Sequence, residues 1–149
     1  MNSKLKNLPL RDGVGIVVLN KQNKVFVAKR IDNPKNFWQM PQGGVDNGED
    51  LHKAALRELR EETGIKNVTL IKEIDGFTIY NLPKSLLGII WKGKFKGQKQ
   101  KWYIFKFNGD DKEINLNTDK PEFLDWKWVG IDQITNNVVD FKLDVYKKI

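Results

Sequence analysis

Gly43-Gly44-Val45-Asp46-Asn47-Gly48-Glu49, followed after seven residues by Arg57-Glu58-Leu59-Arg60-Glu61-Glu62-Thr63-Gly64-Ile65, is the stretch that decides the fold of this chain. Glu58, Glu61 and Glu62 stand at positions i, i+3 and i+4, which share one face of a helix. Carboxylates held so close repel one another unless a cation lies between them, and such oxygen ligands suit Mg²⁺ or Mn²⁺. The pattern therefore predicts a metal-dependent enzyme that acts on phosphates.

A plainer interpretation of this helix is a solvated run of charge, as most charge runs are. At about 100° per residue, however, Leu51, Ala54 and Ala55 form an apolar stripe that the three glutamates continue. Lys53 and Arg60 lie on the far side of the helix. We therefore expect the acidic half of the helix to face inward, which favours a metal site over an ordinary surface.

The same stretch matches the Nudix box without a departure: Gly43, five residues, Glu49, seven residues, then Arg57-Glu58-Leu59-x-Glu61-Glu62-x-Gly64-Ile65. The chain thus resembles the Nudix hydrolases, which hydrolyse nucleoside diphosphates linked to another moiety. The resemblance implies an α/β fold in which a mixed β-sheet is sandwiched between α-helices. It also implies one Nudix domain over residues 1–149, with the box forming a loop, a helix and a second loop.

The resemblance also assigns roles to residues of the box. Glu58, Glu61 and Glu62 would bind the divalent metal as catalytic residues, and either Glu61 or Glu62 would orient or deprotonate the attacking water. Gly43 would offer its carbonyl oxygen to the metal. The structural residues of the box would be Gly43, Glu49, Arg57 and Gly64, with Arg57 and Glu49 bracing the loop against the helix.

The composition is that of an ordinary globular domain, with 149 residues, 40% hydrophobic and 30% charged. The chain has no cysteine, which excludes disulfides, thiolate zinc sites and cysteine nucleophiles. The single histidine, His52, excludes a histidine-rich metal cluster, and we expect it to face solvent. No run near the chain start suits a signal peptide, and no segment approaches the ~20 apolar residues of a membrane span, so the expected location is cytoplasmic.

The net charge of +7 favours polyanionic partners such as RNA or nucleotides. A coding bias toward Lys, Asn and Ile explains this charge equally well. The charge is unevenly distributed, because residues 46–62 hold six acids and three bases inside the basic chain. An acidic metal pocket in a basic body suits a polyphosphate substrate.

The pattern along the chain predicts a mixed α/β domain. Asn47 or Asp50 is expected to cap the central helix, and Gly64 to end it. The predicted elements are a strand hairpin over 15–19 and 25–28, a loop over 38–48, a helix over 50–63, strands over 68–74, 77–80, 87–91, 101–107 and 126–129, loops over 92–100 and 108–120, and a helix over 138–148.

Four further segments narrow the resemblance: Trp38–Gly44, Gly97–Trp102, Pro121–Trp128 and Val138–Tyr146. Taken singly, their aromatic residues are more often part of a core. Together they resemble bacterial RNA pyrophosphohydrolases and the related dinucleoside polyphosphate hydrolases, over almost the whole chain. The preferred activity is removal of pyrophosphate from the 5′-triphosphate end of RNA, which leaves a 5′-monophosphate and promotes mRNA decay. The alternative substrate is diadenosine tetraphosphate.

Carried over by position, Glu122 matches a further metal-binding acid, although a single acid in a loop is more often solvated. The position of Phe141 is one at which the subgroup stacks a base. One departure is Asp12, where the subgroup commonly has proline, and it leaves the pose of the preceding arginine open. The positions that contact substrate phosphates are Arg11, Lys29 or Arg30, Gln39 and Lys142.

A competing hypothesis from another class is a non-catalytic RNA-binding module on the same scaffold. The basic composition and the aromatic residues permit such a module. The intact box argues against it, because a binding module has no need for three clustered carboxylates.

Overall fold

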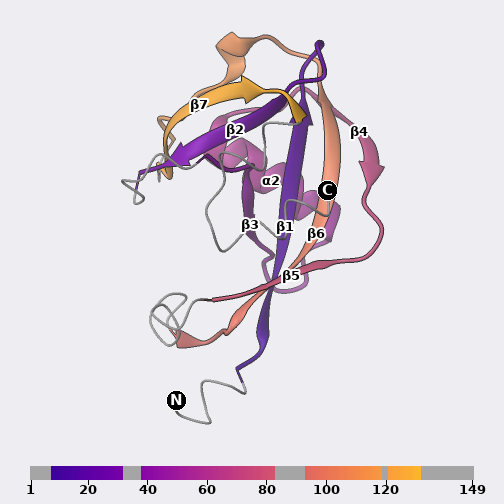
Figure 1. Cartoon of the computed structure of the whole chain (residues 1–149), viewed down its shortest axis with the longest axis vertical. Coiled ribbons are helices and arrows are strands. Elements are labelled where there is room, and N and C mark those ends of the chain that lie inside the picture. Colours follow the sequence, from indigo (N-terminus) through magenta and orange to yellow (C-terminus); the bar gives the residue numbers. More distant parts are fainter. Residues whose placement is uncertain (1–7, 32–37, 83–92, 119–120, 132–149) are drawn as a thin grey trace.

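The computed structural model describes residues 8–31, 38–82, 93–118 and 121–131 of the 149-residue chain. Within these ranges the chain forms a seven-stranded mixed sheet with helix α2 (Leu51–Thr63) lying against it (Figure 1). The order across the sheet is β4-β6-β1-β2-β7, with β3 paired to β1 and β5 paired to β6. The strands are β1 Leu10–Leu19, β2 Val25–Arg30, β3 Gln42–Gly44, β4 Val68–Glu73, β5 Thr78–Asn81, β6 Gly97–Phe107 and β7 Phe123–Val129.

Strands β1 and β2 form the predicted hairpin. The Oδ1 atom of Asn20 accepts hydrogen bonds from the backbone N–H groups of Gln22 and Lys24, at 3.0 and 2.9 Å. Asn23 takes a left-handed conformation with φ 59°, which asparagine tolerates better than most residues. The polar turn therefore closes the hairpin through its own side chains.

Strand β6 joins the sheet together because it pairs with three strands. It runs parallel to β1 and antiparallel to β4 and β5. The predicted loop over 92–100 is wrong at residues 97–100, which belong to β6. Gln98, Gln100 and Trp102 are buried, whereas Lys99 and Lys101 between them are partly exposed. This period of two is the pattern of a strand, and the basic composition hid it.

The predicted loop over 38–48 is also wrong in part, because it contains strand β3. Its residues pair antiparallel with β1, and Gly43 lies opposite Val14. Three residues that include two glycines have little strand propensity of their own, so the pairing with β1 makes this strand. The consequence is that the backbone of Gly43 lies in the sheet, next to α2.

Helix α2 has the predicted caps. Asp50 precedes it, and its Oδ2 atom accepts a hydrogen bond from the backbone N–H of Lys53 at 3.1 Å. Gly64 ends it with φ 76°, a conformation that favours glycine, and donates its N–H to the carbonyl of Arg60 at 2.8 Å. The helix buries Ala54, Ala55 and Leu59 completely against the sheet.

Apolar side chains cover both faces of the sheet. One core cluster joins α2 to Val14, Ile16, Phe105 and their neighbours. The other cluster lies on the opposite face around Trp102 and Val27. The predicted mixed α/β architecture is thus confirmed, while the predicted strand over 87–91 and the helix over 138–148 lie outside the described residues. In the described part of the chain, the helical segments are too short and polar for a membrane span.

Candidate active site

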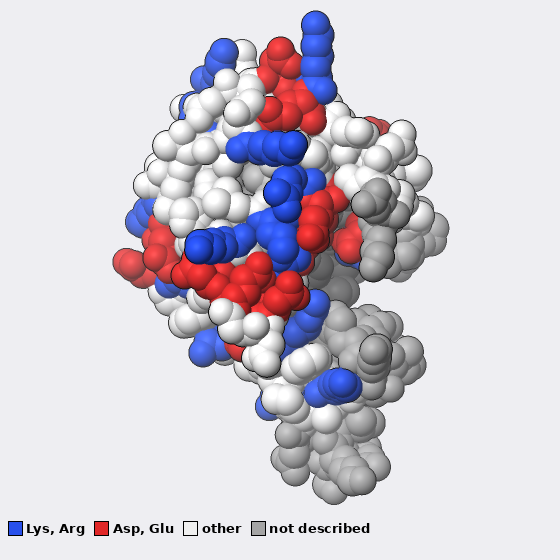
Figure 2. All heavy atoms as spheres, turned by 180° about the vertical axis from the view of Figure 1, so that it is seen from behind, with Lys and Arg blue, Asp and Glu red and all other residues white. Residues whose placement is uncertain are grey.

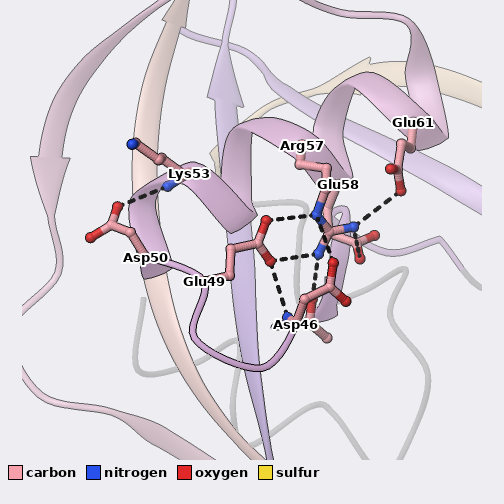
Figure 3. A network of polar contacts seen from close by, with 8 residues as sticks. Asp46, Glu49, Asp50, Lys53, Arg57, Glu58 and Glu61 are labelled. Carbon is pink, nitrogen blue, oxygen red and sulfur yellow. Dashed lines mark hydrogen bonds and ion pairs between the residues drawn. The ribbon is translucent and has the colours of Figure 1, made fainter.

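Arg57 is the centre of a polar network that joins α2 to the loop before it (Figure 3). Its Nε and Nη2 atoms donate to the two carboxylate oxygens of Glu49 at 2.8 and 2.9 Å. The same Nη2 donates to the carbonyl of Gly44 at 3.0 Å. Its Nη1 donates to Glu58 and to Glu61, both at 3.1 Å. One guanidinium therefore fixes the loop and holds two of the three helix carboxylates.

The contact between Arg57 and Glu49 is strongly electrostatic. The hydrogen bonds from Arg57 and from the backbone N–H of Asp46 lower the pKa of Glu49 to about 2. The same hydrogen bond raises the pKa of Arg57 above its ordinary value. The Asp46 carboxylate is a fourth acid beside this guanidinium, with its Oδ2 atom 3.6 Å from Nε of Arg57. Both partners thus stay charged at neutral pH, as the bracing role implied by the resemblance requires.

Glu62 lies on the inner side of the helix and is only 4% exposed. Burial raises its pKa well above the ordinary value, and the nearby carboxylates of Glu122 and Glu58 raise it further. Burial likewise raises the pKa of Glu58, against the opposing effect of Arg57. The structure therefore brings Glu58, Glu62 and Glu122 together, although Glu122 lies some sixty positions further along the chain.

These residues have the chemistry of a divalent-metal site. Among the described residues, no group of three or more acidic or histidine side chains is arranged, as it stands, to hold a metal ion. The carboxyl groups meet in pairs through Glu62, while Arg57 draws Glu61 and Glu58 to itself. One oxygen of Glu62, Oε2, is nevertheless buried without a hydrogen-bond partner. A buried carboxylate oxygen in this position is a suitable ligand for a cation.

Gly43 allows the closest approach between the sheet and the acidic side chains. A Cβ atom at this position would lie 2.2 Å from Cδ of Glu58. Any residue other than glycine would therefore push the Glu58 carboxyl group away from β3. The predicted metal-binding glycine is thus placed beside a predicted metal-binding acid.

The end of β2 places the predicted phosphate contacts beside the predicted metal ligands. Nη1 of Arg30 lies 3.6 Å from Oε2 of Glu122, and the carbonyl of Glu122 accepts a hydrogen bond from Ile31 N–H at 2.9 Å. The register between β2 and β7 shifts between Lys29 and Arg30. Arg30 is therefore brought beside the carboxylate of Glu122, and its contact with a phosphate remains a prediction.

The other predicted contacts are distributed around this region. Arg11 lies on β1 beside Gly44, where an added Cβ would come within 2.1 Å of its Nη2. Gln39 is 1% exposed and exchanges backbone hydrogen bonds with Ala28. Their contacts with substrate remain predictions. Phe141 and Lys142 lie outside the described residues.

One cluster near the site was missed by the sequence analysis. The amide of Gln100 donates to the side-chain oxygens of Gln42, which precedes Gly43, and of Gln98. Trp102 Nε1 donates to Thr78 Oγ1 at 2.7 Å, and that hydroxyl reaches Gln100 at 3.4 Å. These buried amides fix β3 to β6 beside the site. The signal that could have revealed them is the alternation of glutamine and lysine over 98–101, which has the period of a strand.

His52 corrects another expectation. We expected it to face solvent, but its ring stacks on Tyr103 and Phe105 with centroids 5.7 and 5.9 Å away. The aromatic residues of β6 were not visible as its partners from helix spacing alone. The contact packs the first turn of α2 onto the sheet and leaves the site unchanged.

Comparison with known proteins adds three findings. The family model described as the NUDIX domain matches residues 9–149. RNA pyrophosphohydrolase from Pelagibacter ubique is 68% identical over 149 residues, covering 100% of this chain and 94% of the relative. RNA pyrophosphohydrolase from Rhodospirillum rubrum is 49% identical over 142 residues, covering 95% and 86%.

Solved structures share the fold at low sequence identity. The E. coli dihydroneopterin triphosphate pyrophosphohydrolase has a TM-score of 0.72 at 19% identity, covering 95% of this chain and 97% of that one. A C. elegans Ap4A hydrolase has a TM-score of 0.63 at 22% identity, covering 91% and 93%. At these identities the likeness concerns the fold alone.

Proposed function

Because this chain belongs to the Nudix hydrolase family, we propose that it is an RNA pyrophosphohydrolase, which removes pyrophosphate from the 5′-triphosphate end of RNA. The observation that carries the proposal is the 68% identity, over the whole chain, with the RNA pyrophosphohydrolase of Pelagibacter ubique. The product would be RNA with a 5′-monophosphate, which opens the transcript to decay. We place this activity in the cytoplasm and in one domain over residues 1–149.

The cofactor in this proposal is Mg²⁺ or Mn²⁺, held by the carboxylates of Glu58, Glu61, Glu62 and Glu122 and the carbonyl of Gly43. A divalent ion neutralises phosphate oxygens and lowers the pKa of bound water. The buried Oε2 of Glu62, which has no hydrogen-bond partner in the described chain, supports this assignment.

The protein side chains have separate tasks in the reaction. Glu61 or Glu62 orients or deprotonates the water that attacks the phosphoanhydride. Glu61 is the more accessible of the two, with a side chain 54% exposed, whereas Glu62 is 4% exposed. Arg57 keeps Glu58 and Glu61 on one side of the helix. Positioning of this kind is the main protein contribution to phosphoryl transfer.

We propose that cationic side chains near the carboxylates of Glu58, Glu62 and Glu122 bind the triphosphate. In this proposal Arg30 or Lys29 pairs with phosphate oxygens, and the position of Arg30 Nη1, 3.6 Å from Oε2 of Glu122, supports the assignment. Arg11, Gln39 and Lys142 complete the proposed phosphate contacts, and Phe141 stacks the first bases.

A side-by-side comparison of rates tests the substrate. The substrates are 5′-triphosphorylated RNA, diadenosine tetraphosphate and free nucleoside triphosphates, each at saturating Mg²⁺. We expect the highest kcat/KM on RNA, with pyrophosphate and 5′-monophosphorylated RNA as products. A higher kcat/KM on diadenosine tetraphosphate would contradict the RNA assignment while leaving the metal site in place.

A further inference from the structure

The outer side of α2 carries a groove that the proposed reaction does not use. It has a volume of about 420 Å³ and is lined by Lys53, Leu56, Arg57, Arg60, Ile65 and Lys66. The four helix residues stand at i, i+3, i+4 and i+7, so they follow one side of the helix. Figure 2 shows basic side chains gathered at the middle of this face, with acidic side chains beside them. We refer to these six residues as the α2 groove.

The α2 groove is strongly positive. Four of its six lining residues are cations, and none of the six is acidic. The charge of Arg57 is taken up by Glu49, Glu58 and Glu61. In the described part of the chain, Lys53 and Arg60 form no ion pair with an acid. Lys53 and Arg60, two of the four cations, therefore remain available to an anion, while Lys66 also acts on the carboxylate of Glu113.

The spacing of these cations favours a chain of phosphates over a single anion. Lys53 and Arg60 are separated by about 10 Å along the helix axis, at the usual rise per residue. That separation exceeds the Debye length of about 8 Å at physiological ionic strength, so the two cations act largely independently, each on a phosphate of its own. No aromatic side chain is among the six lining residues, so the groove offers contacts to phosphates and none for stacking bases.

We infer that the α2 groove binds the sugar-phosphate backbone of single-stranded RNA downstream of the 5′ end, independently of sequence. This inference rests on the proposed function, because RNA is the substrate. Arg57 connects the two regions: it lines the groove and also binds Glu58 and Glu61 of the catalytic site. Along the helix, Arg60 lies between Glu58 and Glu61, and Lys53 lies about 7.5 Å of helix rise before Glu58.

A binding measurement that needs no catalysis tests the groove. The probe is a fluorescent 5′-hydroxyl RNA of about 12 nucleotides, whose affinity is measured by anisotropy at several salt concentrations. The test protein carries Lys53→Ala and Arg60→Ala, which keep a good helix former at both positions. We expect about 5–10-fold weaker binding and a salt slope smaller by about 1.4, or ~0.7 for each lost phosphate contact.

A matched control carries Lys21→Ala and Lys112→Ala, two exposed lysines that line a different cavity. It has the same change in net charge. We expect near wild-type affinity and salt slope for this control. An equal loss in both double variants, or no loss in the groove variant, would overturn the inference. Thermal melting of each variant shows that the fold is intact.

Kinetics separate this inference from the proposed function. For the groove variant, KM on a triphosphorylated RNA of about 12 nucleotides should rise about fivefold, with KM on a triphosphorylated dinucleotide unchanged. An equal rise on both substrates would overturn the inference. If the wild-type protein failed to hydrolyse either RNA, the proposed function would fail, while the 5′-hydroxyl RNA would still report on the groove.

Discussion

At the residue scale, Gly43 brings the backbone of the sheet next to Glu58, a proposed metal ligand. Its replacement by alanine would place Cβ 2.2 Å from Cδ of Glu58. The clash is with the end of a flexible side chain, so the carboxyl group can move without disturbing the core. We therefore expect Gly43→Ala to fold with nearly wild-type stability and to lose about 10²-fold in kcat, since small displacements of reacting groups are that costly.

Gly76→Ala is the matched control for this prediction. Gly76 has φ 76°, and an added Cβ would meet nothing within 4 Å. Alanine there is strained, so the free energy of unfolding should fall by about 1 kcal/mol while kcat stays unchanged. Thermal melts and kcat on triphosphorylated RNA are measured for both variants. We expect Gly43→Ala to lose kcat but little stability, and Gly76→Ala to lose stability but not kcat. Wild-type kcat in Gly43→Ala would contradict the placement of Glu58 beside Gly43 in the site.

Arg57→Lys tests whether stability depends on the several hydrogen bonds that the guanidinium of Arg57 donates at once. Lysine has one compact ammonium group, so it cannot serve both oxygens of Glu49 and the carbonyl of Gly44 together. We expect the free energy of unfolding to fall by about 1–3 kcal/mol, the usual range for charged hydrogen bonds in a partly buried place. Urea unfolding measures it. Arg60→Lys, with no such contacts in the described chain, should change stability by less than about 0.5 kcal/mol.

The contacts of Arg57 could not be predicted from the sequence pattern alone. Helix spacing predicted that Glu58, Glu61 and Glu62 face inward together. The structure buries Glu62 and partly buries Glu58, but it leaves Glu61 exposed. The role of Arg57 as a brace came from resemblance alone. Its simultaneous contact with Gly44 depends on the short strand β3, which no local pattern indicated.

At the element scale, Glu113 fastens the turn after α2 to the short helix η2 (Asp111–Glu113). Its carboxylate accepts hydrogen bonds from the backbone N–H groups of Lys66 and Asn67, at 2.9 and 3.0 Å. Burial is the largest single influence on its pKa and raises it, but the hydrogen bonds from Asn67 and Lys66 together outweigh burial and lower the pKa below the ordinary value. A carboxylate of this kind stabilises the fold above its unfolded-state pKa and loses that effect as pH falls through its folded-state pKa.

Glu113→Ala should therefore destabilise the protein at pH 7 by about 1 kcal/mol, a modest figure because the side chain is only partly buried. The difference from wild type should shrink as pH falls below the ordinary glutamate pKa of about 4.3. Urea unfolding across this pH range measures the difference. A constant difference down to pH 3 would show that the ionised carboxylate is not the stabilising group.

The elements show where sequence reasoning works and where it stops. The hairpin, the central helix and both helix caps were predicted because their signals are local. Residues 42–44 and 97–100 became strands through pairing with β1 and β5, which lie far away in sequence. The glycine and lysine residues of these segments favoured a loop prediction, although the residues of 97–100 alternate with the period of two that is typical of a strand. The buried glutamines of β6 were missed for the same reason.

At the scale of the whole molecule, the fold concentrates acid on α2 within a chain of net charge +7. Glu58, Glu62 and Glu122 repel one another when no cation is bound. A metal that binds only the folded state raises stability by mass action. The thermal midpoint should therefore rise when millimolar Mn²⁺ is added to chelated protein, and rise less in Glu58→Gln. Equal rises in both proteins would contradict the carboxylate site.

The fold class and the family were predictable at this scale, because the box and four further segments span nearly the whole chain. The choice between RNA and a dinucleoside polyphosphate was not, since both substrates present the same phosphates to the same motifs. The proposal that the substrate is RNA rests on the identity with the Pelagibacter relative. The α2 groove also had no sequence signal of its own, because Lys66 and Ile65 join the helix residues only after the Gly64 turn.

The central claim is metal-dependent cleavage of a 5′-triphosphate by the carboxylates around Glu62. Its most direct test measures pyrophosphate release from triphosphorylated RNA by wild type, Glu62→Gln and the exposed control Glu73→Gln, with Mg²⁺ or with chelator. We predict release by wild type and Glu73→Gln with Mg²⁺, none with chelator, and a loss of about 10²–10⁴-fold in Glu62→Gln. Release that persists in chelator, or Glu62→Gln turnover above about one third of wild type, would contradict the claim.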